Sequence, residues 1–462
     1  MKQSESGQIW VPAVSKADGP LYLAIASAIG ADIASGRLLA GARLPPQRAL
    51  AELMGIDFTT ISRAYNEARR RGLIEGRVGQ GTYVRARAPG QLQPMAGIVD
   101  MSMNLPPRFA DDGLVRRMWQ DIASVQGDDG LDLLLRYQEA GGSAADRAAG
   151  AQWLAPVLPE VTPERLLVTP GAQGALMAVI GHLAKPGDLV CAEALTYPGF
   201  KALAAYLGLR VRALAMDGEG ILPEAFESAC RDEKPKALYC TPTLHNPTTA
   251  TMSLERRQAI AEIATRFGVP IVEDDAYALL PRNGLAPLAS FAPQLTYYVA
   301  SLAKCLSPAL RVAYLVVPDM RSVGRLAGNI RASTAIASPL TAAIATRWID
   351  TGVAASILRA IQQESKERQR MLSRLLPDAI AHQEAFHAWL PLGGAWDRHS
   401  FSAKLRSVGI GVVPSDAFAM AEAPEAVRLG LGSVVSRTDL EASLNMIADI
   451  LGQAPALTSM VV

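Results

Sequence analysis

SLAKCLSPALR, residues Ser301–Arg311, places one lysine in an apolar setting and decides how the rest of the chain is interpreted. The stretch follows the apolar run YYVAS, and leucine, alanine and cysteine surround Lys304. An apolar setting gives a charged ammonium group little hydration, so two interpretations of Lys304 are open. Lys304 is either a surface lysine whose apolar stem reaches water, or a buried amine whose pKa is lowered by desolvation.

Lys304 belongs to a region in which helical stretches alternate with short apolar strands. The strands are RLLVT, DLVCAE, KALYCT, PIVED, YYVAS and VAYLVV, between residues 165 and 317. This alternation predicts an α/β fold with a mostly parallel sheet. A long helical region, residues 338–376, follows, and then a smaller α+β part that ends near Leu451.

Polar side chains stand where these strands end. After the first strand, Ala172 and Gln173 open a helix, and N–H groups at a helix start favour a phosphate. The later strand ends deliver Tyr197, Asn246, Asp274, Tyr277, Ser301, Lys304 and Arg311. Ligands of open α/β sheets bind beyond such strand ends. Each residue alone is more often structural, but their order favours one shared ligand.

Pyridoxal 5′-phosphate needs this set of groups. Its aldehyde takes a lysine amine, its pyridine nitrogen takes a carboxylate, and its phosphate suits a forked arginine. The interpretation of Lys304 as a snorkelling surface lysine is therefore the weaker one.

Residues 98–450 closely resemble fold-type I aminotransferases, and the resemblance implies a role for each of these residues. Lys304 would form the aldimine, Asp274 would pair with the pyridine nitrogen, and Tyr197 would stack on the ring. The phenolate oxygen would meet Tyr277 and Asn246, and the phosphate would meet Ala172, Gln173, Ser301 and Arg311.

The same resemblance places two further residues and reveals one departure. The segment VRLGLGS would use Arg428 to hold the carboxylate of an incoming amino compound. Tyr137, in RYQEAGG, would reach the phosphate in the partner subunit. Ala303 departs from the family, because many relatives have a second serine there.

The N-terminal part of the chain is typical of a winged helix-turn-helix. Helical patterns cover residues 21–35, 47–54 and 57–72, and a glycine-bent hairpin pattern, LIEGRVGQGTYV, follows. Residues 20–84 contain eight arginines and five acidic residues, although the net charge of the chain is only +1. A helical cap with a solvated arginine face is the alternative, but the order of the elements favours DNA binding.

The second helix of such a motif enters the major groove with its N-terminal residues. Thr59, Thr60, Ser62 and Arg63 are therefore predicted near bases or flanking phosphates. Arg48 and Arg77 suit contacts with the DNA backbone.

Residues 20–84 resemble the GntR family of bacterial regulators, on the segments LPPQRALAE, FTTISRAY and GQGTYV. Phe58 departs from that pattern, because many members have a basic residue before the two threonines. It is expected either to touch a thymine methyl group or to pack inward. A GntR-type domain in front of an aminotransferase-like domain resembles the MocR subfamily of regulators, which implies a homodimer.

The remaining expectations concern organisation and compartment. The predicted parts are an N-terminal tail (1–19), the DNA-binding domain (20–84), a linker (85–97) and the aminotransferase-like domain (98–462). The four cysteines have irregular spacing and no CxxC pair, which favours a reducing compartment and no metal site. With neither a signal peptide nor a membrane-length apolar run, the expected location is the cytoplasm.

The sequence therefore predicts a pyridoxal-phosphate-dependent regulator that binds an operator in double-stranded DNA. It would sense an amino acid or a related amino compound by aldimine exchange at Lys304. A working aminotransferase with an accessory DNA-binding module is the alternative. A DNA-binding architectural protein without cofactor is a third possibility. The identity of the effector and the direction of regulation are not predicted.

Overall fold

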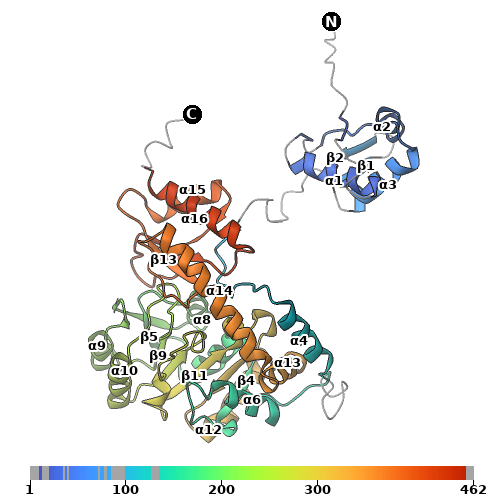
Figure 1. The fold of residues 1–462 in the computed structure, drawn as a ribbon. Coiled ribbons are helices and arrows are strands. Elements are labelled where there is room, and N and C mark those ends of the chain that lie inside the picture. The colour runs from blue at the N-terminus through green and yellow to red at the C-terminus, as the bar shows by residue number, and fades with distance from the viewer. Residues whose placement is uncertain are drawn as a thin grey trace. The chain divides into compact units, whose positions relative to one another are not determined.

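The computed structural model describes residues 10–12, 20–34, 37–38, 41–70, 73–77, 81–84, 99–125 and 135–453. Within these ranges it leaves out the side chains of residues 31, 34, 70, 75 and 77. The chain separates into two compact units, Met1–Gly97 and Ile98–Val462. In Figure 1 the first unit is blue and the second runs from cyan to red.

The first unit is built from three helices and a hairpin. The helices are α1 (Leu21–Ala34), α2 (Gln47–Met54) and α3 (Phe58–Arg70), and β1 (Ile74–Arg77) pairs antiparallel with β2 (Gly81–Val84). Helix α3 buries one face at helical spacing, through Ile61, Ala64, Tyr65 and Ala68. Gly55 ends α2 in the left-handed conformation, with φ of 62°. The predicted winged helix-turn-helix is confirmed.

The second unit contains a seven-stranded sheet. In chain order its strands are β4 (Leu166–Thr169), β5 (Leu189–Glu193), β6 (Arg210–Leu214), β9 (Ala237–Cys240), β10 (Ile271–Asp274), β11 (Thr296–Ser301) and β12 (Ala313–Val316). Their spatial order is β4-β12-β11-β10-β9-β5-β6, and only β12 runs antiparallel to its neighbours. The predicted mostly parallel α/β sheet is confirmed.

Helices cover both faces of this sheet. One face, including Leu167, Val299 and Leu315, packs on α7 (Gly171–Leu183), α8 (Pro198–Tyr206) and α12 (Met320–Thr334). The opposite face packs on α6 (Ala144–Leu154), α9 (Pro223–Glu233), α10 (Leu254–Phe267), α13 (Pro339–Asp350) and the first part of α14 (Val353–Leu375). Helix α4 (Asp112–Ala123) lies beside α13 and α14.

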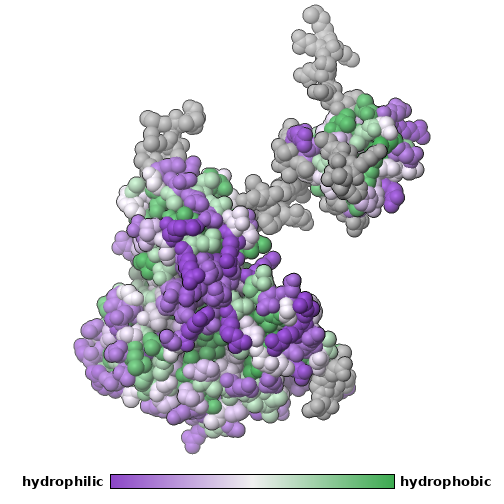
Figure 2. Space-filling view, viewed as in Figure 1, coloured by the Kyte–Doolittle hydropathy of each residue, from purple (hydrophilic) through white to green (hydrophobic). Residues whose placement is uncertain are grey.

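A smaller α+β part follows along α14, which spans both parts of the unit in Figure 1. Its antiparallel sheet has the order β13 (His387–Pro391), β16 (Ala426–Gly430), β15 (Val413–Pro414), and α15 (Arg398–Ser407) and α16 (Arg437–Leu451) pack on it. β14 (Ile410–Gly411) pairs with β3 (Val99–Asp100), which joins the beginning of the unit to its smaller part. The outward face of α14 carries Arg359, Gln363, Arg370 and Arg374, and it forms a hydrophilic stripe in Figure 2.

Two features differ from the sequence interpretation. Strand β6, RVRAL, was not predicted, because this edge strand exposes arginines and lacks a continuous apolar run. The helical region 338–376 is two helices, because Gly352 has φ of 75° between α13 and α14.

Short elements complete the unit. They are α11 (Leu302–Cys305), the pair β7 (Met216–Asp217) and β8 (Gly220–Ile221), and 3₁₀ turns at Pro163–Arg165, Leu288–Ser290, Pro308–Leu310 and Ser415–Ala417.

Candidate functional site

Lys304 and Asp274 come from neighbouring parallel strands. Asp274 is the last residue of β10 and pairs in register with Val299 of β11, whose end leads into α11 and Lys304. The Lys304 Nζ donates a hydrogen bond to the backbone oxygen of Asn104. Burial, followed by the charge of Arg428, lowers the pKa of Lys304 to about 8, while Asp274 opposes the shift. The residue is half-buried as a whole, but its amine is desolvated, as the second interpretation requires.

Asp274 has one carboxylate oxygen to spare. Its Oδ2 accepts a hydrogen bond from the Tyr239 hydroxyl at 2.9 Å, and the Tyr239 ring stacks on Phe200 at 4.0 Å. Its Oδ1 is buried and has no partner in the described part of the chain. Burial raises the pKa of Asp274 to about 6. A buried acceptor in this state suits the N–H of a protonated pyridine ring.

The acidic residues beside Asp274 have structural contacts. The Glu273 carboxylate accepts the backbone N–H groups of Leu288 and Ala289, both at 2.9 Å. The Asp275 pKa is raised by burial and held back by the charge of the buried Arg257. Of the three consecutive acidic residues Glu273, Asp274 and Asp275, Asp274 is therefore the cofactor candidate, and the other two have partners within the protein.

Two of the predicted phosphate groups, the start of α7 and Arg311, lie together. Gly171 begins α7 with φ of 76°, and a Cβ built there would lie 3.5 Å from Nη2 of Arg311. The arginine side chain therefore lies against the bare backbone of the helix start. The Ser301 Oγ accepts the N–H of Ala303 at 3.2 Å. Gln173 donates to the backbone oxygen of Gly199 at 3.0 Å, and its buried Oε1 has no partner among the described residues.

Tyr197 lies half-buried at the start of α8, close to this end of the site. A Cβ on Gly199 would lie 2.3 Å from Cε1 of Tyr197, so only glycine allows the ring to lie there. Burial, followed by the negative charge of Asp274, raises the pKa of Tyr197, and the charges of Arg311 and Arg428 oppose this shift. The ring is thus within electrostatic reach of the carboxylate and both arginines.

Arg428, in β16, is a buried cation with spare donors. Its Nη1 donates to Oδ1 of Asn246 at 3.0 Å, and its Nη2 donates to the backbone oxygen of Ser102. Its Nε is buried without a partner in the described part of the chain, and burial lowers the pKa of Arg428. The Tyr277 hydroxyl accepts the Asn104 Nδ2 at 2.8 Å, which brings Tyr277 to the same site.

Sequence reasoning missed residues 99–105, here called the threading segment. Its Ser102 and Asn104 supply the carbonyl oxygens for Arg428 and Lys304. The segment passes so close to Gly430 and Gly432 that neither position has room for a side chain. A Cβ on Gly430 would lie 2.3 Å from the Met103 oxygen, and a Cβ on Gly432 would lie 1.9 Å from the Leu105 oxygen. The spaced glycines of VRLGLGS were the available signal.

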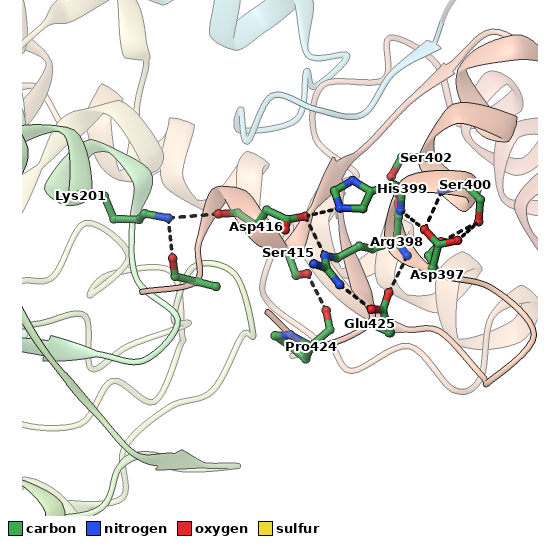
Figure 3. Close-up of polar contacts among 11 residues, drawn as sticks. Lys201, Asp397, Arg398, His399, Ser400, Ser402, Ser415, Asp416, Pro424 and Glu425 are labelled. Atoms are coloured by element: carbon green, nitrogen blue, oxygen red, sulfur yellow. Dashed lines mark hydrogen bonds and ion pairs between the residues drawn. The ribbon is translucent and has the colours of Figure 1, made fainter. Parts of the chain in front are cut away.

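The turn Ser415–Ala417 and the residues after it connect the two parts of the unit. From α8, the Lys201 Nζ donates to the backbone oxygens of Asp416 at 3.1 Å and Ala419 at 2.6 Å. Figure 3 shows this lysine on one side of the turn and Arg398, which bonds the Asp416 carboxylate at 2.8 Å, on the other. These contacts hold Phe418, whose ring centroid lies 5.1 Å from the Arg428 guanidinium carbon.

The predicted DNA-contacting residues cluster around the start of α3. Thr59, Arg63 and Arg48 are exposed, whereas Thr60 and Ser62 are half-buried. The backbone N–H and the hydroxyl of Thr59 both donate to Oδ1 of Asp57, as expected of a cap. The Arg63 guanidinium lies 4.4 Å from the ring centroid of Tyr22 in α1.

Two predicted residues stand apart from these sites. The side chain of Arg77, in β1, lies outside the described residues. Tyr137 is 98% exposed, so this single chain does not bury it in the site around Lys304.

Comparison with known proteins agrees with both units. The sequence profile of aminotransferase class I and II matches residues 97–447, and that of bacterial regulatory proteins of the gntR family matches residues 21–84. The HTH-type transcriptional regulator YdeF of Bacillus subtilis is 29% identical over 96% of both chains. The probable rhizopine catabolism regulatory protein MocR of Rhizobium meliloti is 27% identical over 78% of each chain.

The second unit also resembles solved enzymes. LysN, an α-aminoadipate aminotransferase of Thermus thermophilus solved with N-(5′-phosphopyridoxyl)-L-leucine, superposes with a TM-score of 0.69 at 23% identity. The match covers 79% of this chain and 94% of LysN. It shows the fold.

The fold and the family profiles define the class: the chain belongs to the aminotransferase class I and II family and carries a gntR-type DNA-binding domain in front. This combination and its relatives place it in the MocR subfamily of DNA-binding transcriptional regulators. Pyridoxal phosphate is the cofactor that the aminotransferase fold implies. Among the described residues, no helix has the length and apolarity to cross a bilayer, and no cluster of three or more His, Cys, Asp or Glu could bind a metal.

Proposed function

We propose that this regulator binds pyridoxal phosphate at Lys304 and senses an amine that also carries an acidic group. One observation carries the proposal: the amine of Lys304 and the guanidinium of Arg428 both hold carbonyl oxygens of the threading segment. In the sequence that segment begins at residue 99, and the predicted linker to the DNA-binding domain ends at residue 97. Lys304, proposed to bind the cofactor, and Arg428, proposed to bind the effector, are thus the residues that hold the segment next to the linker.

The residues present suit the cofactor. Asp274 offers a buried, unpartnered oxygen to the pyridine nitrogen, and Tyr197 offers a ring held over Gly199. The start of α7, with Ser301 and Arg311, would bind the phosphate. Asn246 and Tyr277 would contact the phenolate oxygen. When bound, pyridoxal phosphate supplies an aldehyde carbon that primary amines attack reversibly.

The protein contributes an available amine and a second anchoring point. The lowered pKa of Lys304 leaves a sizeable fraction of its amine unprotonated and nucleophilic near neutral pH. Arg428 has an unpartnered Nε and lies over Phe418 in a buried setting, where a carboxylate or sulfonate would give it a charged partner. An effector amine would take the place of the Lys304 amine, while its acidic group binds Arg428.

Both events change what holds the threading segment. An acid on Arg428 competes with the Ser102 oxygen for the guanidinium. Attachment of the cofactor to Lys304 would remove the donor to the Asn104 oxygen, and an effector amine that displaces Lys304 would restore it. The segment is then free to take a second arrangement, and the effector favours it by its differential affinity. A shift here would be transmitted through residues 85–97 to the DNA-binding domain proposed for residues 20–84.

Assembly and location belong to the same proposal. The full exposure of Tyr137 suits a residue that completes the site of a second copy, in a homodimer located in the cytoplasm with its operator. The set of residues around Lys304 is the set that an aminotransferase uses, so turnover is a second candidate. Keto acid release from amino donors at enzyme-like rates would favour catalysis over sensing.

The test uses the full chain loaded with pyridoxal phosphate and a panel of primary amines with a carboxylate or sulfonate. Active members of the panel should change the cofactor absorption of the wild type. Arg428→Gln should lose at least tenfold in apparent affinity for these acids and keep its response to methylamine. Exposed Lys236, replaced by alanine, serves as a control and should respond as the wild type does.

Borohydride treatment gives the second readout, because it should fix the cofactor to the peptide that contains Lys304. Fixation elsewhere, or equal affinity for acidic amines in Arg428→Gln and the wild type, would contradict the proposal.

A further inference from the structure

We propose that Phe58 reads the 5-methyl group of a thymine in the operator. Phe58 is the first residue of α3, the second helix of the helix-turn-helix. In this motif the N-terminal residues of that helix lie against base edges in the major groove. The inference therefore assigns a base-reading role at the position where the chain departs from its family.

The packing of the first unit leaves Phe58 available. The buried face of α3 is formed by Ile61, Ala64, Tyr65 and Ala68, whereas 43% of the Phe58 side chain is exposed. The expectation that Phe58 packs inward is thus not met. Exposing this apolar ring to water is unfavourable in free energy. Contact with an apolar group of a partner would remove that unfavourable exposure.

The surroundings of the ring favour a base rather than a phosphate. The guanidinium carbon of Arg48 lies 5.9 Å from the Phe58 ring centroid. Phe58 and Arg48 also line a hollow between α2 and α3, together with the acidic residues Glu52 and Asp57. The charges of Glu52 and Asp57 offset that of Arg48 beside the ring, and the ring itself offers a phosphate no hydrogen-bond donor. In the major groove, the apolar group that a base presents is the 5-methyl group of thymine.

The experiment selects duplexes from a random library with the full, pyridoxal-phosphate-loaded chain. The wild type should select thymine at a defined position of each half-site, and Phe58→Ala should lose that preference while the other positions stay unchanged. A uracil placed at that position removes only the methyl group and should weaken wild-type binding roughly 3- to 10-fold. Cytosine at that position should bind better once it is methylated at C5.

Two matched variants control for the loss of an exposed ring. Phe267 lies at the end of α10, in the other unit, with the guanidinium carbon of Arg266 5.6 Å from its ring centroid, and it is 36% exposed, so Phe267→Ala removes a similar pair outside the DNA-binding domain. Leu53→Ala removes an apolar side chain, 52% exposed, from α2. Both should keep the wild-type preference.

Three results would overturn the proposal. The first is equal wild-type affinity for the thymine and uracil duplexes, which needs no variant and so does not depend on whether Phe58→Ala folds. The second is a selected site without thymine at any position. The third is an unchanged thymine preference in Phe58→Ala.

Discussion

At the scale of single residues, desolvation explains most of the chemistry at this site. Lys304, Asp274 and Arg428 are withdrawn from water, and burial is the first cause of the pKa shift of each. For Lys304 the direction is downward, which increases the unprotonated amine near neutral pH. The Asp274 shift is upward because burial disfavours its negative charge, and a cationic N–H at its unpartnered Oδ1 would offset that cost.

The Lys304 pKa predicts how cofactor capture depends on pH. Only the unprotonated amine attacks the aldehyde, so the capture rate of the cofactor-free chain should rise about tenfold per pH unit below pH 8 and level off above it. Stopped-flow absorbance, with Lys304→Ala as the background, measures the rate. A rate that still rises steeply toward pH 10, as expected of an exposed lysine, would show that Lys304 is not desolvated.

Most of the candidate site residues could be proposed from the sequence because they follow strands in a recognisable order. Asp274 and Lys304 follow adjacent strands whose apolar runs are plain in the sequence. Asn104 was not predictable in this way. It contacts Lys304 and Tyr277 from a segment distant in sequence, and no periodicity marks that segment.

At the scale of elements, Gly430 and Gly432 leave the space through which the threading segment passes. Gly432→Ala would place a Cβ 1.9 Å from the Leu105 oxygen, so the backbone there has to move. We expect a loss of about 1–3 kcal/mol in the free energy of unfolding and a reduced effect of the amine on operator affinity. Denaturant titration and operator binding by anisotropy measure the two.

Gly328→Ala is the control for this substitution. Gly328 lies within α12, and a Cβ there meets nothing within 4 Å. This variant should be as stable as the wild type or gain about 0.5–1 kcal/mol, with an unchanged amine response. If Gly432→Ala behaves like Gly328→Ala in both measurements, the threading segment does not couple the two units.

Elements differ in how far the sequence predicts them, and the reason is burial. Strands β9, β10 and β11 are buried throughout and read as apolar runs, so their prediction holds. Edge strand β6 alternates arginines with apolar residues and has less contact with the core. The break between α13 and α14 depends on one left-handed glycine inside an otherwise helical pattern.

At the scale of the whole molecule, the two units have separate cores. The first unit buries its own cluster, including Ile25, Leu50, Ile61 and Tyr65, and the described residues of this cluster all belong to the first unit. Domains with their own cores unfold as separate units unless their interface is large. The positive charge between residues 20 and 84 likewise belongs to the unit that would meet DNA.

This separation predicts two calorimetric transitions with different ligand responses. Pyridoxal phosphate should raise the melting temperature of the larger transition, because a ligand stabilises the part that binds it. The smaller transition should stay within about 1 °C. Lys304→Ala should abolish most of the rise, since the covalent attachment is lost. A single transition that moves as a whole with the cofactor would contradict this view of the molecule.

The central claim is that an effector amine that displaces Lys304 from the cofactor changes how the protein binds DNA. The most direct measurement is operator affinity with and without an active acidic amine, compared between the wild type and Lys304→Ala, both supplied with pyridoxal phosphate. The account predicts a shift of at least fivefold in the wild type, within the usual range of allosteric coupling, and none in Lys304→Ala. Equal shifts in the two proteins would contradict it.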